Sequence, residues 1–395
     1  MKKVCSDRSA SIPEDVVVEI LARVKDAAVL FRCATACKGW RHLVLAHARL
    51  DDLCAFVGFF TQEEPPREGC TATWFVPAPG PVPAVLGPRR RLLSSLAPSS
   101  PSFFFDSAVP LTSCHGVLLL RLDRHSRGPG AVLAVCDPLA GALRILPSFR
   151  RRYVTGYALL TDAYCWSSSG GQQRQGPFFK VLIITIHKKP AQYSLHTLSS
   201  ADNSGWKKVC SGDALQDEHQ GIRATLRQRD AVVCDGKVHW LFSGASGIYT
   251  LDVRIKTEHV SFTKLINIEL HDLFGHPSYG IPYLTTDAEG RLMLVCLHKD
   301  SRQIETWTSH RSFQTSNIDR KQEDTTKVYT CLGENSGTIL VINNYQAVYV
   351  VNVNTGVMEQ VTELPYGHGL TRRNTVLLDI NWPTFFATRL GVVAM

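Results

Sequence analysis

The stretch "VCDPLAGALRILP", which runs from Val135 to Pro147, contains two short apolar runs separated by turn-forming residues. Asp137 begins the turn, and Gly141 stands where the chain needs a positive φ, which glycine adopts without steric cost. Short runs rich in Val, Leu and Ile and bounded by Asp, Gly or Pro are typical of β-strands. The stretch therefore predicts a β-hairpin.

The same arrangement recurs twice further along the chain. "TLDVRIKTEHVSFTKL" (250–265) and "VVNVNTGVMEQVTELP" (350–365) also join two apolar runs by a polar link, with Asp252 or Asn352 at the expected turn. In the last copy Gly356 takes the positive-φ position. Each copy has an upstream companion in which a glycine precedes a strongly apolar run: "SCHGVLLLRL" (113–122), "VVCDGKVHWLF" (232–242) and "GENSGTILVI" (333–342). A four-strand unit that repeats every ~40–50 residues is typical of a β-propeller blade.

Counting such units predicts an all-β domain over residues 50–395, organised as a six-bladed β-propeller, with five or seven blades as alternatives. The units lie near 50–85, 103–147, 153–210, 230–266, 279–310 and 328–365. The C-terminal stretch "TVLLDINWPTFFATRL" (375–390) is a candidate to complete the first blade. Proline-rich or low-complexity composition predicts loops near 61–100, 167–177 and 309–327.

The first fifty residues follow a helical pattern instead. Residues 1–10 are expected to be a flexible N-terminus, and Ser11 with Glu14 predicts a capping box at the start of a helix. Asp26 is a candidate N-cap for a second helix, and Gly39 is expected to end that helix before a third. Three helices in about forty residues are too small to bury their own apolar side chains, so they need cover from the rest of the chain or from another protein.

"IPEDVVVEILARV", followed by "LFRCATACKGWRHLV", resembles an F-box: it has the Ile-Pro opening, an acidic residue after it, the "EIL" core and a closing Cys-Lys-x-Trp. Lys25-Asp26-Ala27 replaces the proline that usually follows the first helix. The whole chain is similar to plant-type F-box proteins that carry a C-terminal F-box-associated, kelch-like propeller. The resemblance implies an F-box over 11–49 that binds a Skp-type adaptor and, through it, a cullin-RING ubiquitin ligase. The adaptor-binding residues that it implies are Ile12, Pro13, Val17, Ile20, Leu21, Leu30, Trp40 and Leu43.

Composition narrows the classes of function. No run of eighteen apolar residues is present, so no membrane span is expected, and the start of the chain has no secretory pattern. Twelve scattered cysteines in such a chain favour reduced thiols, and the nucleus or the cytoplasm is the expected location. A net charge of +8 is mild, and the triplets at 89–91, 150–152 and 187–189 are shorter than nucleic-acid-binding blocks. We expect no nucleic-acid partner.

No motif for catalysis or metal binding stands out. Cys33, Cys37, His42 and His47 lack the paired spacing of zinc ligands, and the first two are expected on a buried helix face. "GHPSYG" (275–280) and "YGHGL" (366–370) are interpreted as loops. The sequence therefore predicts no metal, no cofactor, no catalytic residue and a non-catalytic chain.

Together these observations predict the substrate-recognition subunit of a Skp–cullin–F-box ubiquitin ligase, which presents a target protein on its propeller. The alternative is a propeller that binds a ligand or acts as an enzyme, glycan-binding or oxidase-like, with the N-terminal helices as a docking module only. The sequence does not identify the target.

Overall fold

A computed structural model describes the helices, the strands and many of the turns. The described residues are 12–24, 26–48, 50, 56–62, 72–78, 86–87, 89–96, 105, 108–122, 131–149, 156–161, 178–188, 191–201, 205–213, 225–244, 247–266, 282–287, 290–297, 303–308, 311–317, 329–335, 338–343, 347–353, 357–363 and 375–390.

Three helices open the chain, as predicted: α1 (Glu14–Arg23), α2 (Ala27–Ala36) and α3 (Lys38–His47). The predicted capping box is not what starts α1, because Pro13 is the N-cap and makes no side-chain cap bond, and Ser11 lies outside the described residues. The N-cap of α2 is confirmed, since the backbone N–H of Val29 donates to Oδ1 of Asp26 at 3.2 Å.

The junction between the second and third helices differs from the prediction. Gly39 lies inside α3 rather than between two helices, and Cys37 is the N-cap, whose Sγ accepts from the N–H of Trp40 at 3.4 Å. Cys37 is therefore exposed, not on the buried face where the sequence placed it.

The rest of the chain is mainly β, and strand pairing divides its described strands into six small antiparallel sheets. Five sheets use strands that follow one another in sequence. The first two of these sheets consist of β4 (Ala108–Cys114), β5 (Val117–Leu122), β6 (Leu133–Asp137) and β7 (Ala142–Ile145), and of β8 (Gly156–Thr161), β9 (Phe179–Lys188), β10 (Ala191–Ser199) and β11 (Lys207–Asp213). The third consists of β12 (Thr225–Leu226), β13 (Val232–Cys234), β14 (Lys237–Gly244), β15 (Gly247–Arg254) and β16 (Val260–Ile266). The last two consist of β17 (Tyr283–Thr286), β18 (Leu292–Leu297), β19 (Gln303–Thr308) and β20 (Arg311–Asn317), and of β21 (Tyr329–Asn335), β22 (Thr338–Asn343), β23 (Ala347–Asn352) and β24 (Met358–Glu363).

The remaining sheet joins the two ends of the β domain. Its order is β25-β1-β2-β3, in which β25 (Thr375–Asp379) pairs with β1 (Phe56–Gln62), followed by β2 (Thr73–Pro77) and β3 (Arg91–Leu92). The expectation that the C-terminal stretch completes the first blade is thus confirmed for 375–379. Beyond it, α7 (Trp382–Arg389) is a helix rather than a continuation of the sheet.

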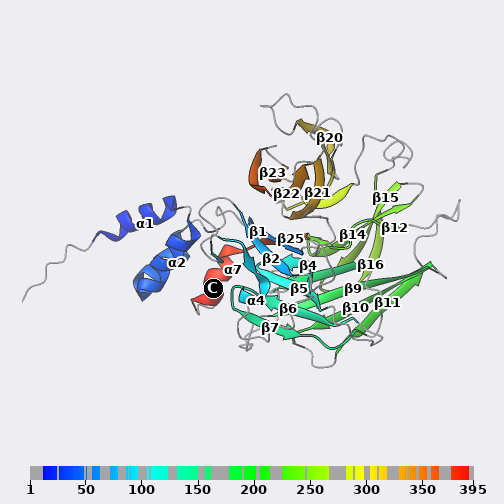
Figure 1. Ribbon diagram of the computed structural model, residues 1–395, viewed down its shortest axis with the longest axis horizontal. Helices are drawn as coiled ribbons and strands as arrows, with labels where there is room; N and C mark the ends of the chain where they lie inside the picture. The colour runs from blue at the N-terminus through cyan, green and yellow to red at the C-terminus, as the bar shows by residue number, and fades with distance from the viewer. Residues whose placement is uncertain are drawn as a thin grey trace, which may run out of the picture.

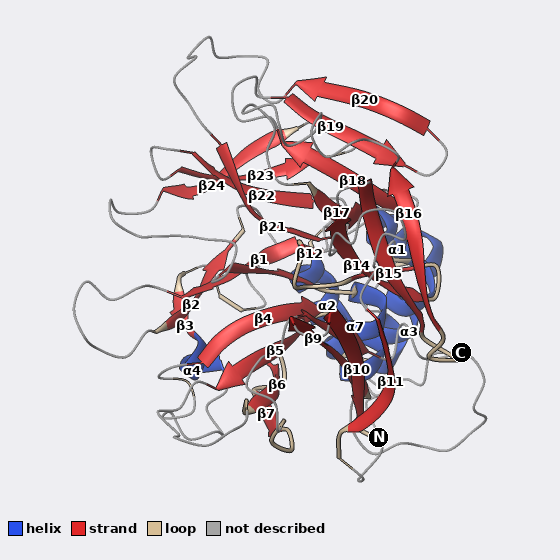
Figure 2. Ribbon diagram, turned by 90° about the vertical axis from the view of Figure 1, so that its right-hand side faces the viewer, coloured by secondary structure: helices blue, strands red, loops and turns tan. Residues whose placement is uncertain are grey.

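The sheets are arranged around a common axis, as in a β-propeller, with outer strands such as β7, β20 and β24 at the rim (Figure 2). The innermost strands close a ring. β25 contacts β4, β4 contacts β8, β13 contacts β17, β17 contacts β21 and β21 contacts β25. Tyr157 of β8 forms a parallel bridge to Asp230, just before β13. The predicted class, a few helices followed by a propeller-like β domain, is confirmed.

The turn chemistry of the repeat is confirmed in the copy at Val135–Pro147. Oδ1 of Asp137 accepts hydrogen bonds from the N–H groups of Leu139 (3.0 Å) and Ala140 (2.8 Å), and Gly141 has φ +66°. The prediction for the second copy is wrong: Asp252 lies inside β15, and the turn follows Arg254. There Glu258, with φ +56°, adopts the conformation that Gly141 adopts in the first copy.

Two of the predicted loops contain regular elements. The segment 61–100 includes β2, β3 and a short helix, α4 (Leu93–Leu96), and the segment 309–327 includes β20. The composition of a long window predicts a loop when polar or proline residues outnumber the residues of the short strands within it. The loop near 167–177 and the N-terminus 1–10 lie outside the described residues.

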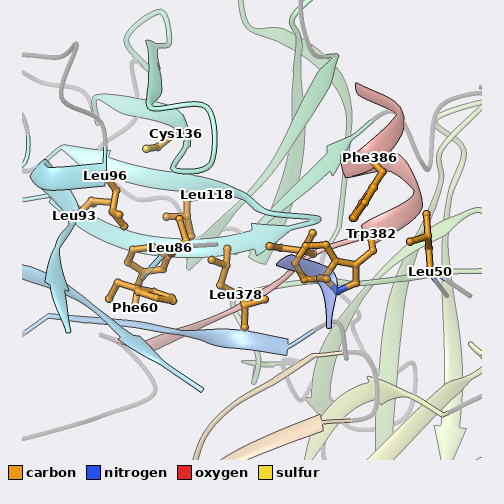
Figure 3. Packing of buried hydrophobic residues seen from close by; sticks show 14 of the residues in the cluster. Leu50, Phe60, Leu86, Leu93, Leu96, Leu118, Cys136, Leu378, Trp382 and Phe386 are labelled. Atoms are coloured by element: carbon orange, nitrogen blue, oxygen red, sulfur yellow. The ribbon is translucent and has the colours of Figure 1, made fainter. Parts of the chain in front are cut away.

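One hydrophobic cluster connects the helices to the propeller. It combines Leu21 and Leu30 of the N-terminal helices with Leu118 of β5, Leu378 of β25 and Phe386 of α7. Figure 3 shows Trp382 and Phe386 of α7 beside Leu50 and close to Leu378, so α7 bridges the two parts. Figure 1 shows α1, α2 and α7 together at one side of the sheets.

Seven cysteines are described, none of them in a disulfide, and four of the seven are buried. Burial raises the pKa of the Cys136 thiol to about 12, and the carboxylate of Asp137 adds to that shift. Among the described helices, none is long and apolar enough to cross a membrane.

Candidate functional site

The N-terminal helices leave a row of apolar side chains in water. Ile12, just before α1, and Val16 and Ile20 on it follow one another at intervals of four residues and are 59%, 41% and 49% exposed. Val16 and Ile20, four residues apart in the helix, lie on the same face of α1, and Ile12 directly precedes the helix. On α2, Val29 is also a large apolar side chain that is exposed, at 38%. We call these four residues the apolar strip.

The opposite face of α1 is buried. Val17 and Leu21 are 6% and 1% exposed and belong to the cluster shared with the propeller. The helix is thus apolar on two sides, of which one packs inside the chain and the other is exposed to solvent. Glu19 and Arg23, which pair at 2.5 Å, lie in water at its C-terminal end.

The structure divides the eight residues that the F-box resemblance implied. Ile12, Pro13 and Ile20 are exposed. The buried members are Val17, Leu21 and Leu30, whereas Trp40 and Leu43 are partly buried and packed against the core. In this arrangement a partner could touch the exposed members directly and the partly buried ones at their edges. Adaptor binding itself stays a prediction.

The helix α7 covers the inner side of the N-terminal helices. Phe31 of α2 packs against Phe385 and Phe386, with ring centroids 5.6 and 5.5 Å apart. The Nη1 of Arg41 donates to the carbonyl of Leu390 at 3.1 Å. These contacts hold the helices against the propeller and leave the apolar strip pointing away from this interface.

A second group of side chains lies where three inner strands end. Nδ1 of His115 and Oγ1 of Thr161 are 2.8 Å apart, and Sγ of Cys114 lies 3.7 Å from each of these atoms. Asp379, at the end of β25, is 7% exposed and close enough for its charge to act on His115. We call His115, Thr161, Cys114 and Asp379 the axial polar cluster.

The turn that carries His115 is a two-residue hairpin between Cys114 and Val117. His115 and Gly116 have φ of +49° and +87°, as a type I′ turn requires. Burial lowers the pKa of His115, and the carboxylate of Asp379 offsets that effect only in part. The imidazole is therefore neutral at neutral pH and can share one hydrogen bond with Thr161 through Nδ1.

A buried hydrogen-bonded pair in the sheet of β12 to β16 has a structural role. Nδ1–H of His239 donates to Oδ1 of Asp252 at 2.8 Å, and the hydroxyl of Thr263 donates to Oδ2 at 2.6 Å. The side chains of His239 and Asp252 are only 7% and 5% exposed. Because the three groups face one another across neighbouring strands inside the domain, they join the sheet rather than meet a substrate.

The other residues that the sequence singled out form no site in the described part of the chain. In the described part of the chain, no three His, Cys, Asp or Glu side chains are placed to hold a metal ion. The histidines of 275–280 and 366–370, and the basic triplet at 150–152, lie outside the described residues. Sequence reasoning missed the axial polar cluster, although "SCHG" was identified as the start of a repeat unit; the signal was a histidine in a position that usually favours Asn, Asp or Gly.

No protein-family model matches the chain, and no curated protein matches it. Solved structures with a related architecture include an α-L-arabinofuranosidase from Fusarium graminearum (11% identity, 65% of this chain and 81% of that chain, TM-score 0.38). Others are an α-L-arabinanase from Penicillium chrysogenum (11%, 69% and 92%, 0.39) and a putative 6-phosphogluconolactonase from Bacteroides fragilis (10%, 81% and 84%, 0.39).

These neighbours correct the expectation of a non-catalytic chain, because the propellers that resemble it include glycoside hydrolases. At TM-scores of 0.38–0.39 and 10–11% identity, they assign no activity or substrate to this chain.

Proposed function

We propose that this chain is a two-part recognition protein, in which the N-terminal helices dock on a Skp-type adaptor and a six-bladed propeller holds a target or ligand. The docking half corresponds to the F-box that the sequence resembles. Through the adaptor, the chain would bring whatever its propeller binds to a cullin-RING ubiquitin ligase, where proximity raises the effective concentration of the target.

The observation that carries the proposal is the apolar strip. Of the seven large apolar side chains that are exposed among the described residues, four lie between Ile12 and Val29. Exposed apolar groups that gather on one element mark an interaction surface, whereas single ones scattered over a protein do not. The strip also includes Ile12 and Ile20, two of the residues that the F-box resemblance assigns to adaptor binding.

The position of the strip fits a docking role. Because α7 packs against the other side of the helices, a partner bound to α1 would be held in a fixed orientation relative to the propeller. A fixed orientation keeps the propeller-bound molecule at a constant distance from the enzyme that the adaptor recruits, which favours transfer.

The test is a titration of the purified full chain with a Skp-type adaptor by isothermal titration calorimetry. Ile20→Ser should weaken binding by about 30-fold or more, the effect of losing one interface anchor worth about 2 kcal/mol. Ile145→Ser is the matched control, because Ile145 is 44% exposed but lies on β7 of the propeller. Absence of binding by the unaltered chain, or equal affinity for both variants, would contradict the proposal.

A second candidate function concerns the propeller itself, and the axial polar cluster favours it. Side chains from β8 and β25 and from the turn after β4 meet there, which is how propellers and other closed β folds build ligand sites from several strands. A neutral imidazole beside a hydroxyl suits a small polar ligand such as a sugar, and the pair could also move a proton during a reaction.

This candidate is tested by a thermal-shift screen of the full chain with a panel of sugars and other small polar compounds. Any stabilising compound is then measured with His115→Asn, because Asn tolerates the left-handed conformation that His115 adopts. Stabilisation that disappears in His115→Asn and in Thr161→Val supports the site. Stabilisation that both variants retain would place the ligand elsewhere.

A further inference from the structure

The charges of the N-terminal helices are sharply divided. Between Ala27 and Leu50 the chain has four Lys or Arg residues and two histidines, and it has no Asp or Glu. On α1 the balance is opposite, since Glu14, Asp15 and Glu19 are exposed and only Arg23 is positive. One helix of the module is therefore acidic, and the other two are basic.

The basic side chains of α2 and α3 lie on the exposed side. Arg32 is exposed three residues after Val29, so it adjoins the apolar strip on the same face of α2. Lys38 and His42 are exposed and four residues apart on α3. We call Arg32, Lys38 and His42 the basic face. Arg41 does not belong to it, because its guanidinium is bound to the carbonyls of Ala34 and Leu390.

Nothing else in the described part of the chain neutralises the basic face. The ion pairs of that part lie elsewhere, at Glu19 with Arg23, Lys180 with Glu258 and Asp287 with Arg291. Exposed basic side chains on a module that also exposes apolar ones are a pattern that a partner of opposite charge can recognise.

We infer that the partner which covers the apolar strip presents an acidic segment to the basic face of α2 and α3. This inference rests on the proposed function, because it concerns the same docking event. It adds the chemistry of the partner's surface: an apolar groove bordered by carboxylates, with the carboxylates opposite Arg32 and Lys38.

The two parts of the surface should act on different steps of binding. Exposed charges at the edge of an interface mainly change the association rate and its dependence on salt. Buried apolar anchors mainly change the dissociation rate. Arg32→Glu/Lys38→Glu is suitable for the test because Glu forms helices about as well as Arg or Lys, and an acidic residue in the first turn of α3 is favourable.

The experiment measures association and dissociation of the full chain with a Skp-type adaptor by stopped-flow fluorescence, at salt concentrations from about 50 to 500 mM, which shorten the screening length roughly threefold. In Arg32→Glu/Lys38→Glu, the association rate at low salt should fall by about tenfold and should depend little on salt, while the dissociation rate changes by less than about twofold. Ile20→Ser should show the reverse pattern.

The matched control is Lys207→Glu/Lys208→Glu, which makes the same change in net charge at two exposed positions of β11. This control should keep the association rate of the unaltered chain within about twofold. An association rate that falls equally in both double variants, or in neither, overturns the inference but leaves the proposed function standing. No binding by the unaltered chain overturns both.

Discussion

The propeller buries its large apolar side chains between neighbouring sheets, whereas the N-terminal helices bury one face and leave the other in water. Sheets in a closed ring have a neighbour on each side, so strands such as β9 and β14 find cover within the chain. Among the described residues, the helices α1–α3 share their apolar cluster with α7 and part of the propeller. The open face is therefore where a binding partner would find apolar surface not already used for folding.

The first way to test this comparison is to remove the bridge between the two parts. Phe386 is fully buried in α7 and packs against Phe31 of α2. Phe386→Ala should lower the free energy of unfolding by about 3–5 kcal/mol, because it leaves a cavity in the shared core. Urea unfolding followed by circular dichroism measures the loss.

Phe386→Leu is the control, since it keeps most of the side-chain volume and should cost less than half as much. A loss below about 1 kcal/mol in Phe386→Ala would mean that the helices do not share a core with α7. The comparison between an anchored face and an open face would then fail.

The second test concerns polar stabilisation inside the propeller. Burial alone would raise the pKa of Asp252, but the hydrogen bonds from His239 and Thr263 outweigh it, so the pKa lies below its ordinary value. Asp252→Asn should lower the free energy of unfolding by about 1.5–3 kcal/mol at neutral pH, because charge-assisted hydrogen bonds are lost.

The sign of the pH dependence follows from this lowered pKa. The stabilisation by the ionised Asp252 is present above about pH 4, the ordinary pKa of an aspartate, and is lost as the pH falls through the folded-state value. The difference in unfolding free energy between the unaltered chain and Asp252→Asn should therefore be constant near neutrality and shrink in acid. A difference that grows in acid would contradict the pair as described.

These positions also show what can be predicted from sequence and what cannot. The apolar runs predicted the strands, and Asp137 with Gly141 predicted the hairpin of Val135–Pro147, because tight turns need local backbone conformations that few residues adopt. The role of Asp252 was misread, since an aspartate between apolar residues resembles a turn unless its partner, thirteen residues earlier on another strand, is known. The axial polar cluster was missed for the same reason: Thr161 and Asp379 meet His115 only in three dimensions.

A third, smaller effect is expected at the turn that lacks glycine. Glu258 adopts φ +56°, and its Oε1 accepts from Nζ of Lys180 at 2.6 Å across two sheets, with both side chains mostly buried. Glu258→Gln should lower the unfolding free energy by about 1 kcal/mol in urea titrations, because it removes the ion pair but keeps the backbone strain. Lys256→Gln, at an exposed position of the same turn, should change it by less than about 0.5 kcal/mol. Equal effects would show that the pair does not link the sheets.

The smallest effect on stability is expected on the open face of α1. Ile20→Ala should change the unfolding free energy by about 0.5 kcal/mol or less, because Ile20 is half exposed. Its neighbour Leu21 is 1% exposed, and Leu21→Ala should cost about 2–5 kcal/mol. Two adjacent residues of one helix thus provide an internal control. Similar losses in both variants, measured by urea unfolding, would mean that the strip is not open.

The most direct test of the central claim is amide hydrogen exchange of the full chain with and without a Skp-type adaptor. A bound partner slows local opening of the backbone that it covers, so exchange should slow in α1 (Glu14–Arg23) and around Val29. The propeller strands should exchange at the same rate in both states. Protection confined to the propeller, or no change in α1 when the adaptor is bound, would contradict the assignment of the apolar strip as the docking surface.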